Sequence, residues 1–255
     1  MLFKLARRTF VNTYPPAKVN GVADFRSDTV TRPCPKMRDA IAMAVVGDEM
    51  YDDCPSTTKL EKDFAELAGK EASIFTTSGT QANLIALMLM AANRGECVII
   101  GDGTHLNLHE RGNFATLGSV FPHTLPNEKD GTISLDTIKS EVPSFVDEHV
   151  AKVTGVSLEN SHNQCGGRIL PPEYVKKVRQ YLKKHKVKLH LDGARAWNAA
   201  VALDQSLSEF CADYDLANFC LSKGLGCPIG TMLVGNEKDI AQAKIYRKML
   251  GGAMR

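Results

Sequence analysis

The sequence predicts an α/β protein with a mainly parallel β-sheet and helices on both of its faces. Short strand-like apolar segments alternate with helix-like segments of about 10–15 residues, which is typical of βαβ units. Several of the strands are apolar at nearly every position, as expected where a sheet is covered on both sides. The chain has 255 residues, of which 44% are hydrophobic and 24% charged, so it can bury a sizeable core.

The spacing of apolar residues predicts each element in turn. Apolar residues three and four apart predict helices, and short continuous or alternating apolar runs predict strands. The run TQANLIALMLMAA is mostly apolar and predicts a buried helix, whereas the helix that begins at Pro172 has a polar face. The predicted helices span residues 36–46, 57–68, 80–92, 172–186 and 237–250. The predicted strands span residues 72–76, 97–101, 119–123, 152–158, 188–191, 214–221 and 230–234.

The charge and the cysteine content indicate what the protein does not bind and in which compartment it is expected. The formal net charge is +2, which gives no large basic face for nucleic acid, and no apolar run approaches the ~18 residues that cross a bilayer. The seven cysteines are odd in number and form no C-x-x-C pair. We therefore expect neither a disulfide framework nor a zinc site, and an intracellular location.

Residues 1–23 are expected to be an N-terminal extension, and residues 24–255 a large domain. Residues 1–14 carry Lys4, Arg7 and Arg8 but no acid, and on a helix their apolar side chains would fall opposite these cations. The pattern resembles a mitochondrial presequence, and the alternative is a short solvated extension. The expected location is the cytosol, or the mitochondrion if the segment is a presequence.

Polar residues follow four of the predicted strands, and in parallel sheets ligands bind beyond the carboxyl ends of the strands. Lys223 follows an apolar strand, where its amine could act as a nucleophile toward an aldehyde or simply reach solvent. Asp192 lies where another strand leaves the sheet, and a buried carboxylate needs a cationic partner. That partner could be a metal ion, Arg195 or a protonated pyridine nitrogen. Lys223 and Asp192 are expected at neighbouring parts of one sheet edge.

Two other strand ends carry groups that could bind an anion or stack on an aromatic ring. Ser78, Gly79 and Thr80 precede a predicted helix, where N–H groups and hydroxyls can bind phosphate or simply cap the helix. His105 could stack on an aromatic ring, act as an acid or base, or satisfy a loop carbonyl. Together with the amine and the carboxylate described above, these groups match the requirements of pyridoxal 5'-phosphate.

Seven motifs lie in order from about Asp24 to the last residue. They are DFRSDTVTRP at 24–33, GDEMYDDCPS at 47–56, SGTQAN at 78–83, SLENSHN at 157–163, LHLDGAR at 189–195, LSKGLGCPIG at 221–230 and RKMLGGAMR at 247–255. Through these motifs the chain resembles the low-specificity L-threonine aldolases, which are aspartate-aminotransferase-like (fold type I) pyridoxal-phosphate enzymes. The resemblance implies aldol cleavage of L-threonine or L-allo-threonine to glycine and acetaldehyde.

The resemblance also implies how the cofactor would be held. Lys223 would bind its aldehyde covalently, Asp192 would pair with its ring nitrogen, and His105 would stack on the ring face. The phosphate would be held by the turn Ser78, Gly79 and Thr80, with Arg255 as a further anion contact that can reach across a dimer interface.

The implied substrate is a small β-hydroxy-α-amino acid. Ser27 and Arg195 would orient its carboxylate, His149 would lie near its hydroxyl, and Tyr51 would line the site from a neighbouring subunit. A site built from two chains implies a homodimer or a homotetramer.

The chain departs from the family pattern at several places, two of which bear on the site or on the domain organisation. Asp52 stands where the family usually has glycine after the motif tyrosine. Family members also continue past the position of Arg255 into a small C-terminal domain, which is expected to be missing here. The alternatives to a threonine aldolase are therefore another fold type I lyase, or a truncated fragment without activity.

Overall fold

The computed structural model describes residues 24–142 and 147–253. The predicted extension at 1–23 and Arg255 lie outside these residues. The chain falls into two compact units that divide after Val30. In the first unit, the Thr29 backbone N–H donates to Ser27 Oγ (3.2 Å) in the 3-10 turn η1 (Asp28–Val30). The second unit, which begins at Thr31, carries the sheet.

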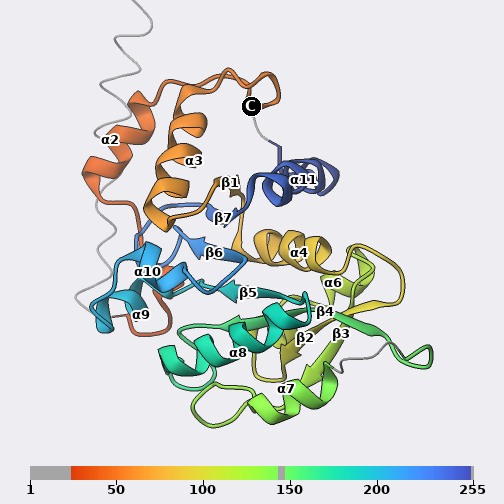
Figure 1. Ribbon diagram of the computed structural model, residues 1–255. Helices are drawn as coiled ribbons and strands as arrows, with labels where there is room; N and C mark the ends of the chain where they lie inside the picture. Colours follow the sequence, from red (N-terminus) through yellow and green to blue (C-terminus); the bar gives the residue numbers. More distant parts are fainter. Residues whose placement is uncertain (1–23, 143–146, 254–255) are drawn as a thin grey trace, which may run out of the picture. The chain divides into compact units, whose positions relative to one another are not determined.

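The second unit is built on a seven-stranded sheet with the strand order β1-β7-β6-β5-β4-β2-β3 (Figure 1). Strand β7 is antiparallel to both of its neighbours, and the other strand pairs are parallel. The strands are β1 (Ala72–Thr76), β2 (Glu96–Gly101), β3 (Phe121–Leu125), β4 (Lys152–Glu159), β5 (Lys188–Asp192), β6 (Leu216–Cys220) and β7 (Thr231–Gly235). The predicted fold class, a mainly parallel sheet, is confirmed.

Helices cover both faces because strand side chains alternate between two hydrophobic clusters. Ile99 of β2 packs in the first cluster, and Val98 and Ile100 pack in the second. The first cluster takes side chains from α3 (Pro55–Ala68), α7 (Leu135–Glu141), α8 (Pro172–Lys184), α9 (Ala196–Ala202) and α10 (Leu207–Cys211). The second takes side chains from α4 (Gly79–Met90), α5 (His105–His109), α6 (Asn113–Thr116) and α11 (Glu237–Met249).

All predicted helices and strands are present, with ends displaced by a few residues at most. The sequence missed α5, α6, α7, α9 and α10, because helices this short show no clear period. Helix α2 (Pro35–Met43) was predicted from its apolar spacing, yet none of its residues is buried. None of the helices in the described parts of the chain combines the length and apolar character needed to cross a membrane.

The cysteines all lie within the described residues, and all seven are free thiols. Cys54, Cys97, Cys211 and Cys220 are buried, so most of the cysteines act as small apolar side chains.

The strand directions bring the polar segments to one edge of the sheet. Strands β1, β2, β4, β5 and β6 run the same way, so their carboxyl ends share an edge with the amino end of β7. Thr231 at the start of β7 is in register with Thr76 at the end of β1 and with Cys220 at the end of β6. The segments predicted to carry chemistry therefore meet there.

A buried ion cluster ties α11 to earlier parts of the chain. Arg247, which is 3% exposed, pairs with Glu49 of the 3-10 turn η2 (Glu49–Tyr51) and with Glu61 of α3, and it donates to the carbonyl of Phe75. Burial lowers the pKa of Arg247 to about 10 and raises the pKa of Glu61.

Arg247→Met should destabilise the protein by about 3–5 kcal/mol, because it leaves two largely buried carboxylates without their cation. Urea unfolding measures the loss. The control is Lys244→Met on the same helix, since Lys244 pairs at 3.9 Å with an exposed Asp52 and should contribute less than about 1 kcal/mol. Equal losses in the two variants would contradict the importance of the cluster.

Candidate active site

Glu159, Asp192 and Asn218 form a polar row across three adjacent strands. Asp192 of β5 is in register with Glu159 of β4 and with Asn218 of β6. The residues next to them in each strand pack in the first hydrophobic cluster. Because strand side chains alternate, the row points to the opposite face, where α4 lies. All three residues are at most 4% exposed.

A chain of hydrogen bonds orients this row. The backbone N–H of Gly193, which can only donate, binds Asn218 Oδ1 (2.8 Å). The amide of Asn218 therefore donates from Nδ2 to Oδ1 of Asn83 on α4. This leaves Nδ2 of Asn83 to donate to Asp192 Oδ2 (2.9 Å) and to Glu110 Oε1 (2.7 Å). Two buried carboxylates thus share one amide, and both accept from it.

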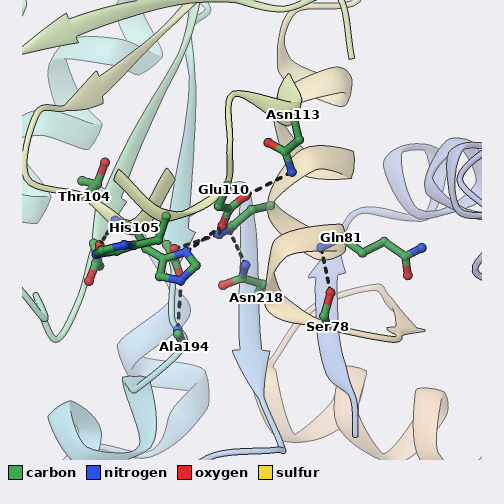
Figure 2. A network of polar contacts seen from close by, with 12 residues as sticks. Ser78, Gln81, Thr104, His105, Glu110, Asn113, Ala194 and Asn218 are labelled. Carbon is green, nitrogen blue, oxygen red and sulfur yellow. Dashed lines mark hydrogen bonds and ion pairs between the residues drawn. The ribbon is translucent and has the colours of Figure 1, made fainter. Parts of the chain in front are cut away.

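His105, at the start of α5, is held from two sides. Its Nδ1 lies 2.9 Å from Glu110 Oε1, and its backbone N–H donates to Glu159 Oε2 (2.7 Å). Figure 2 shows His105, Glu110 and Asn218 gathered together, with Asn113 donating to Glu110 from another direction. Glu110 is 2% exposed, so an enclosed carboxylate anchors the histidine ring.

The carboxylates at this edge act on one another electrostatically. Burial raises the pKa of Glu110, and the charge of Asp192 adds to the rise. Burial, again with Asp192, raises the pKa of Glu159 to about 7. The hydrogen bond to Glu110 raises the pKa of His105, which Asp192 also raises and Lys223 lowers. The site thus gathers negative charge that a bound cation would offset.

Lys223 stands in the turn after β6. Asp192 ends β5, Lys223 follows β6, and the two strands are paired, so both residues lie at neighbouring parts of one sheet edge, as predicted. The hydroxyl of Thr31 donates to the carbonyl of Lys223 (2.6 Å) and supports the turn. Arg195 precedes α9 as its N-cap residue. Burial raises the pKa of Cys220, and the charges of Lys223 and Arg195 counteract that rise, which places both cations near the end of β6.

Ser78, Gly79 and Thr80 form the amino-terminal turn of α4. Ser78 Oγ accepts from the backbone N–H of Gln81 (3.1 Å), so Ser78 caps the helix (Figure 2). A Cβ atom on Gly79 would lie 2.9 Å from Cys220 Sγ, which explains why glycine stands there. This helix start lies at the same sheet edge as Lys223, and helix N-termini favour anions.

Two other predicted residues, His149 and Tyr51, do not join this cluster within the described part of the second unit. His149 pairs with Asp147 (2.9 Å), and 82% of its side chain is exposed. It precedes the eight-residue strand β4, so about 25 Å of strand separates it from the polar row. Because the two ends of a strand lie at opposite edges of the sheet, His149 could approach the substrate hydroxyl at this edge only from another copy of the chain. Tyr51 is 81% exposed, and Ser27 belongs to the first unit.

Sequence reasoning assigned no role to Asn83, Glu110, Glu159 or Asn218, which orient the site. Asn83 interrupts an apolar helix, and Asn218 interrupts an apolar strand. Because buried polar side chains require hydrogen-bond partners, both positions could have been recognised in the sequence. Glu110 could not be recognised in this way, because the short helix α5 that places it beside His105 could not be predicted.

Glu159→Gln should change how stability depends on pH. The ordinary pKa of a glutamate is about 4.5, and burial raises the pKa of Glu159 to about 7. The folded state therefore holds an extra proton between these values. Wild-type stability falls as the pH rises through this window, by about 1.4 kcal/mol per unit of pKa difference. Glutamine cannot ionise, so the variant should gain stability relative to wild type across the same window.

Urea unfolding with no ligand added, at a series of pH values, measures this effect. Glu66→Gln, which changes an exposed glutamate of α3, is the matched control and should follow wild type at every pH. A stability difference between Glu159→Gln and wild type that stays constant with pH would contradict the expectation.

Comparison with known proteins identifies the family. The sequence model of the family described as beta-eliminating lyase matches residues 24–255. The chain is 46% identical over 233 residues to a probable low-specificity L-threonine aldolase 2 of Arabidopsis thaliana, covering 91% of this chain and 66% of the relative. It is 46% identical over 232 residues to the low specificity L-threonine aldolase of Escherichia coli (strain K12), covering 91% and 68%. The chain thus spans about two thirds of the length of these relatives.

Solved structures agree with this result. A putative L-allo-threonine aldolase from Listeria monocytogenes superposes with a TM-score of 0.74 at 27% identity, covering 88% of this chain and 62% of the other. A threonine aldolase from Leishmania major, at 24% identity, shows the same fold with a TM-score of 0.79 over 89% of this chain and 67% of the other. Fold and strand-edge site together define an α/β protein with the architecture of the threonine aldolase large domain. The chain belongs to the beta-eliminating lyase family, among the low-specificity L-threonine aldolases, as its motifs predicted.

Proposed function

We propose that this chain is the cofactor-binding domain of a pyridoxal-phosphate enzyme that cleaves L-threonine or L-allo-threonine to glycine and acetaldehyde. Relatives of 46% identity are named L-threonine aldolases. The structural observation that carries the proposal is the meeting of Lys223, Asp192 and His105 at the carboxyl edge of the sheet.

The groups at this edge fit the cofactor. The ligand atoms of three side chains, His105, Glu110 and Asp192, all lie within 4.8 Å of one another. Such a cluster could bind a protonated ring nitrogen or a metal ion. The nearby amine of Lys223 and the helix start at Ser78 favour the ring, because they serve an aldehyde and a phosphate. When bound, pyridoxal phosphate supplies an aldehyde for the amine and a ring that accepts the electron pair of the broken Cα–Cβ bond.

The protein groups would each hold one part of the cofactor. Lys223 would bind it covalently through Nζ. Asp192 would stabilise a proton on the ring nitrogen, since Asn83 and the Ala194 backbone N–H (3.2 Å) hold its oxygens as acceptors. The turn that begins at Ser78 would bind the phosphate, and Arg255 would be a further anion contact.

Other groups would serve the substrate. Arg195 would bind its carboxylate. The proton of the β-hydroxyl would pass to His105, to a water molecule, or to His149 of a second copy. A second copy is needed for that last route because His149 lies at the opposite edge of its own sheet.

A homodimer or homotetramer would complete the site. Helix α2 buries none of its residues, and apolar side chains in and after it are 54–76% exposed, namely Ile41, Met43, Val45 and Val46. Exposed apolar surface of this kind is typical of an interface. Such an interface would allow the exposed Tyr51 to line a neighbouring site.

Labelling and product analysis together test the proposal. The chain is loaded with pyridoxal phosphate, reduced with borohydride and digested, and the labelled peptide is mapped. Label on Lys223 is expected. Lys70 is the internal comparison, because burial lowers the pKa of its amine but it precedes β1 at the opposite edge. Label on Lys70, or no label, would contradict the site. Acetaldehyde from L-threonine, rather than pyruvate from other amino acids, separates aldol cleavage from β-elimination.

A further inference from the structure

Glu110 is a buried carboxylate that neither binds the substrate nor takes up the proton of the β-hydroxyl in the proposed reaction. It is 2% exposed and contacts three side chains: Asn83 Nδ2 (2.7 Å), His105 Nδ1 (2.9 Å) and Asn113 Nδ2 (3.4 Å). Burying a carboxylate costs free energy unless its hydrogen bonds are made. The contact with His105 is therefore part of a defined network.

The direction of this contact follows from the backbone. The N–H of Gly193 can only donate, so the Asn218 amide accepts from it through Oδ1 and donates from Nδ2 to Asn83. The Asn83 amide then accepts through Oδ1 and donates from Nδ2 to Glu110 Oε1. Oε1 is thus already an acceptor, and its remaining lone pair faces Nδ1 of His105. In the neutral imidazole, Nδ1 therefore carries the proton and Nε2 carries the lone pair.

We propose that Glu110 is a positioning residue that fixes the tautomer of His105 and so makes Nε2 the basic nitrogen available to the substrate. The consequence for catalysis rests on the proposed function, but the tautomer is a property of the chain alone. The hydrogen-bond partner of one imidazole nitrogen generally decides whether the other nitrogen carries a proton or a lone pair.

Other charged groups also face His105. Glu159 binds its backbone N–H, Asp192 and Lys223 act on its ring through their charges, and the ring of His109 lies 5.3 Å away. Within the described residues, Glu110 is the carboxylate that contacts a ring nitrogen of His105. Its replacement should therefore change the tautomer, whereas the other groups change only the electrostatic field.

Imidazole nitrogen NMR of the 15N-labelled, cofactor-free chain tests this. Above the titration of His105, the wild type should show a protonated Nδ1 and an unprotonated Nε2. In Glu110→Gln, the amide can donate to Nδ1, so the tautomers should mix or reverse. The pKa of His105 should also fall, because the hydrogen bond to Glu110 is the largest cause of its rise. Glu141→Gln is the matched control: it changes a carboxylate 2.9 Å from His123 Nε2 and should leave His105 unchanged.

The cofactor-loaded enzyme gives a second readout. In Glu110→Gln, kcat should fall ~10–100-fold, the size of effect known for carboxylates behind metal-binding histidines, with little change in KM. Glu110→Asp keeps the charge on a shorter side chain and should restore part of both kcat and the Nδ1–H signal.

Two results would overturn the proposal: a wild-type His105 protonated on Nε2, or an unchanged tautomer in Glu110→Gln. The first result decides the matter even if the variants do not fold. A wild-type chain that binds no pyridoxal phosphate would contradict the proposed function instead, and the NMR spectra would still decide the role of Glu110.

Discussion

Lys223→Ala should abolish covalent binding of pyridoxal phosphate and lower turnover on the order of 10³-fold or more, since the amine that binds the aldehyde is removed. Arg195, the other cation near the end of β6, cannot replace it because a guanidinium stays protonated. The measurements are the cofactor absorbance that remains after gel filtration and the release of acetaldehyde from L-threonine.

The matched control for this lysine is Lys176→Ala on α8. The side chain of Lys176 is 58% exposed, and its removal should leave both the absorbance and the turnover at wild-type levels. A Lys223→Ala protein that keeps the bound cofactor and its turnover would show that the amine has no covalent role.

Asp192→Asn should keep part of the cofactor binding but lower kcat by ~10²–10³-fold, which corresponds to about 2.7–4 kcal/mol of transition-state stabilisation. An uncharged amide cannot hold a proton on the ring nitrogen, so the ring would accept the electron pair of the broken bond less readily. Asparagine also has one acceptor oxygen where Asp192 uses two, for Asn83 and for the Ala194 N–H. We therefore expect a loss of about 1–3 kcal/mol in stability as well.

Steady-state kinetics and urea unfolding separate the two effects of this change. The control is Asp204→Asn, at an exposed turn with φ of 52°, a conformation that asparagine also adopts readily. It should change neither kcat nor stability noticeably. A kcat in Asp192→Asn equal to that of wild type would exclude a role for this carboxylate at the ring.

Much of the fold was predictable because its signals are local. The apolar runs around Val98 and Leu189 lie in buried strands, and the apolar helix at 80–92 is the buried α4. The site was predicted only where a motif ends a strand, as at Asp192 and Lys223. The spacing of its motif carries no information on which edge of the sheet His149 lies at, or which copy of the chain it serves.

The sequence by itself determined the family, the order of the strands and helices along the chain, and the strand-end residues, since each depends on neighbouring residues or on motif spacing. Only the tertiary structure decided the row of Glu159, Asp192 and Asn218, because strand register sets which side chains lie side by side. It also decided the link through Asn83 to Glu110. Partners far apart in the chain meet only when the packing of α4 on the sheet brings them together.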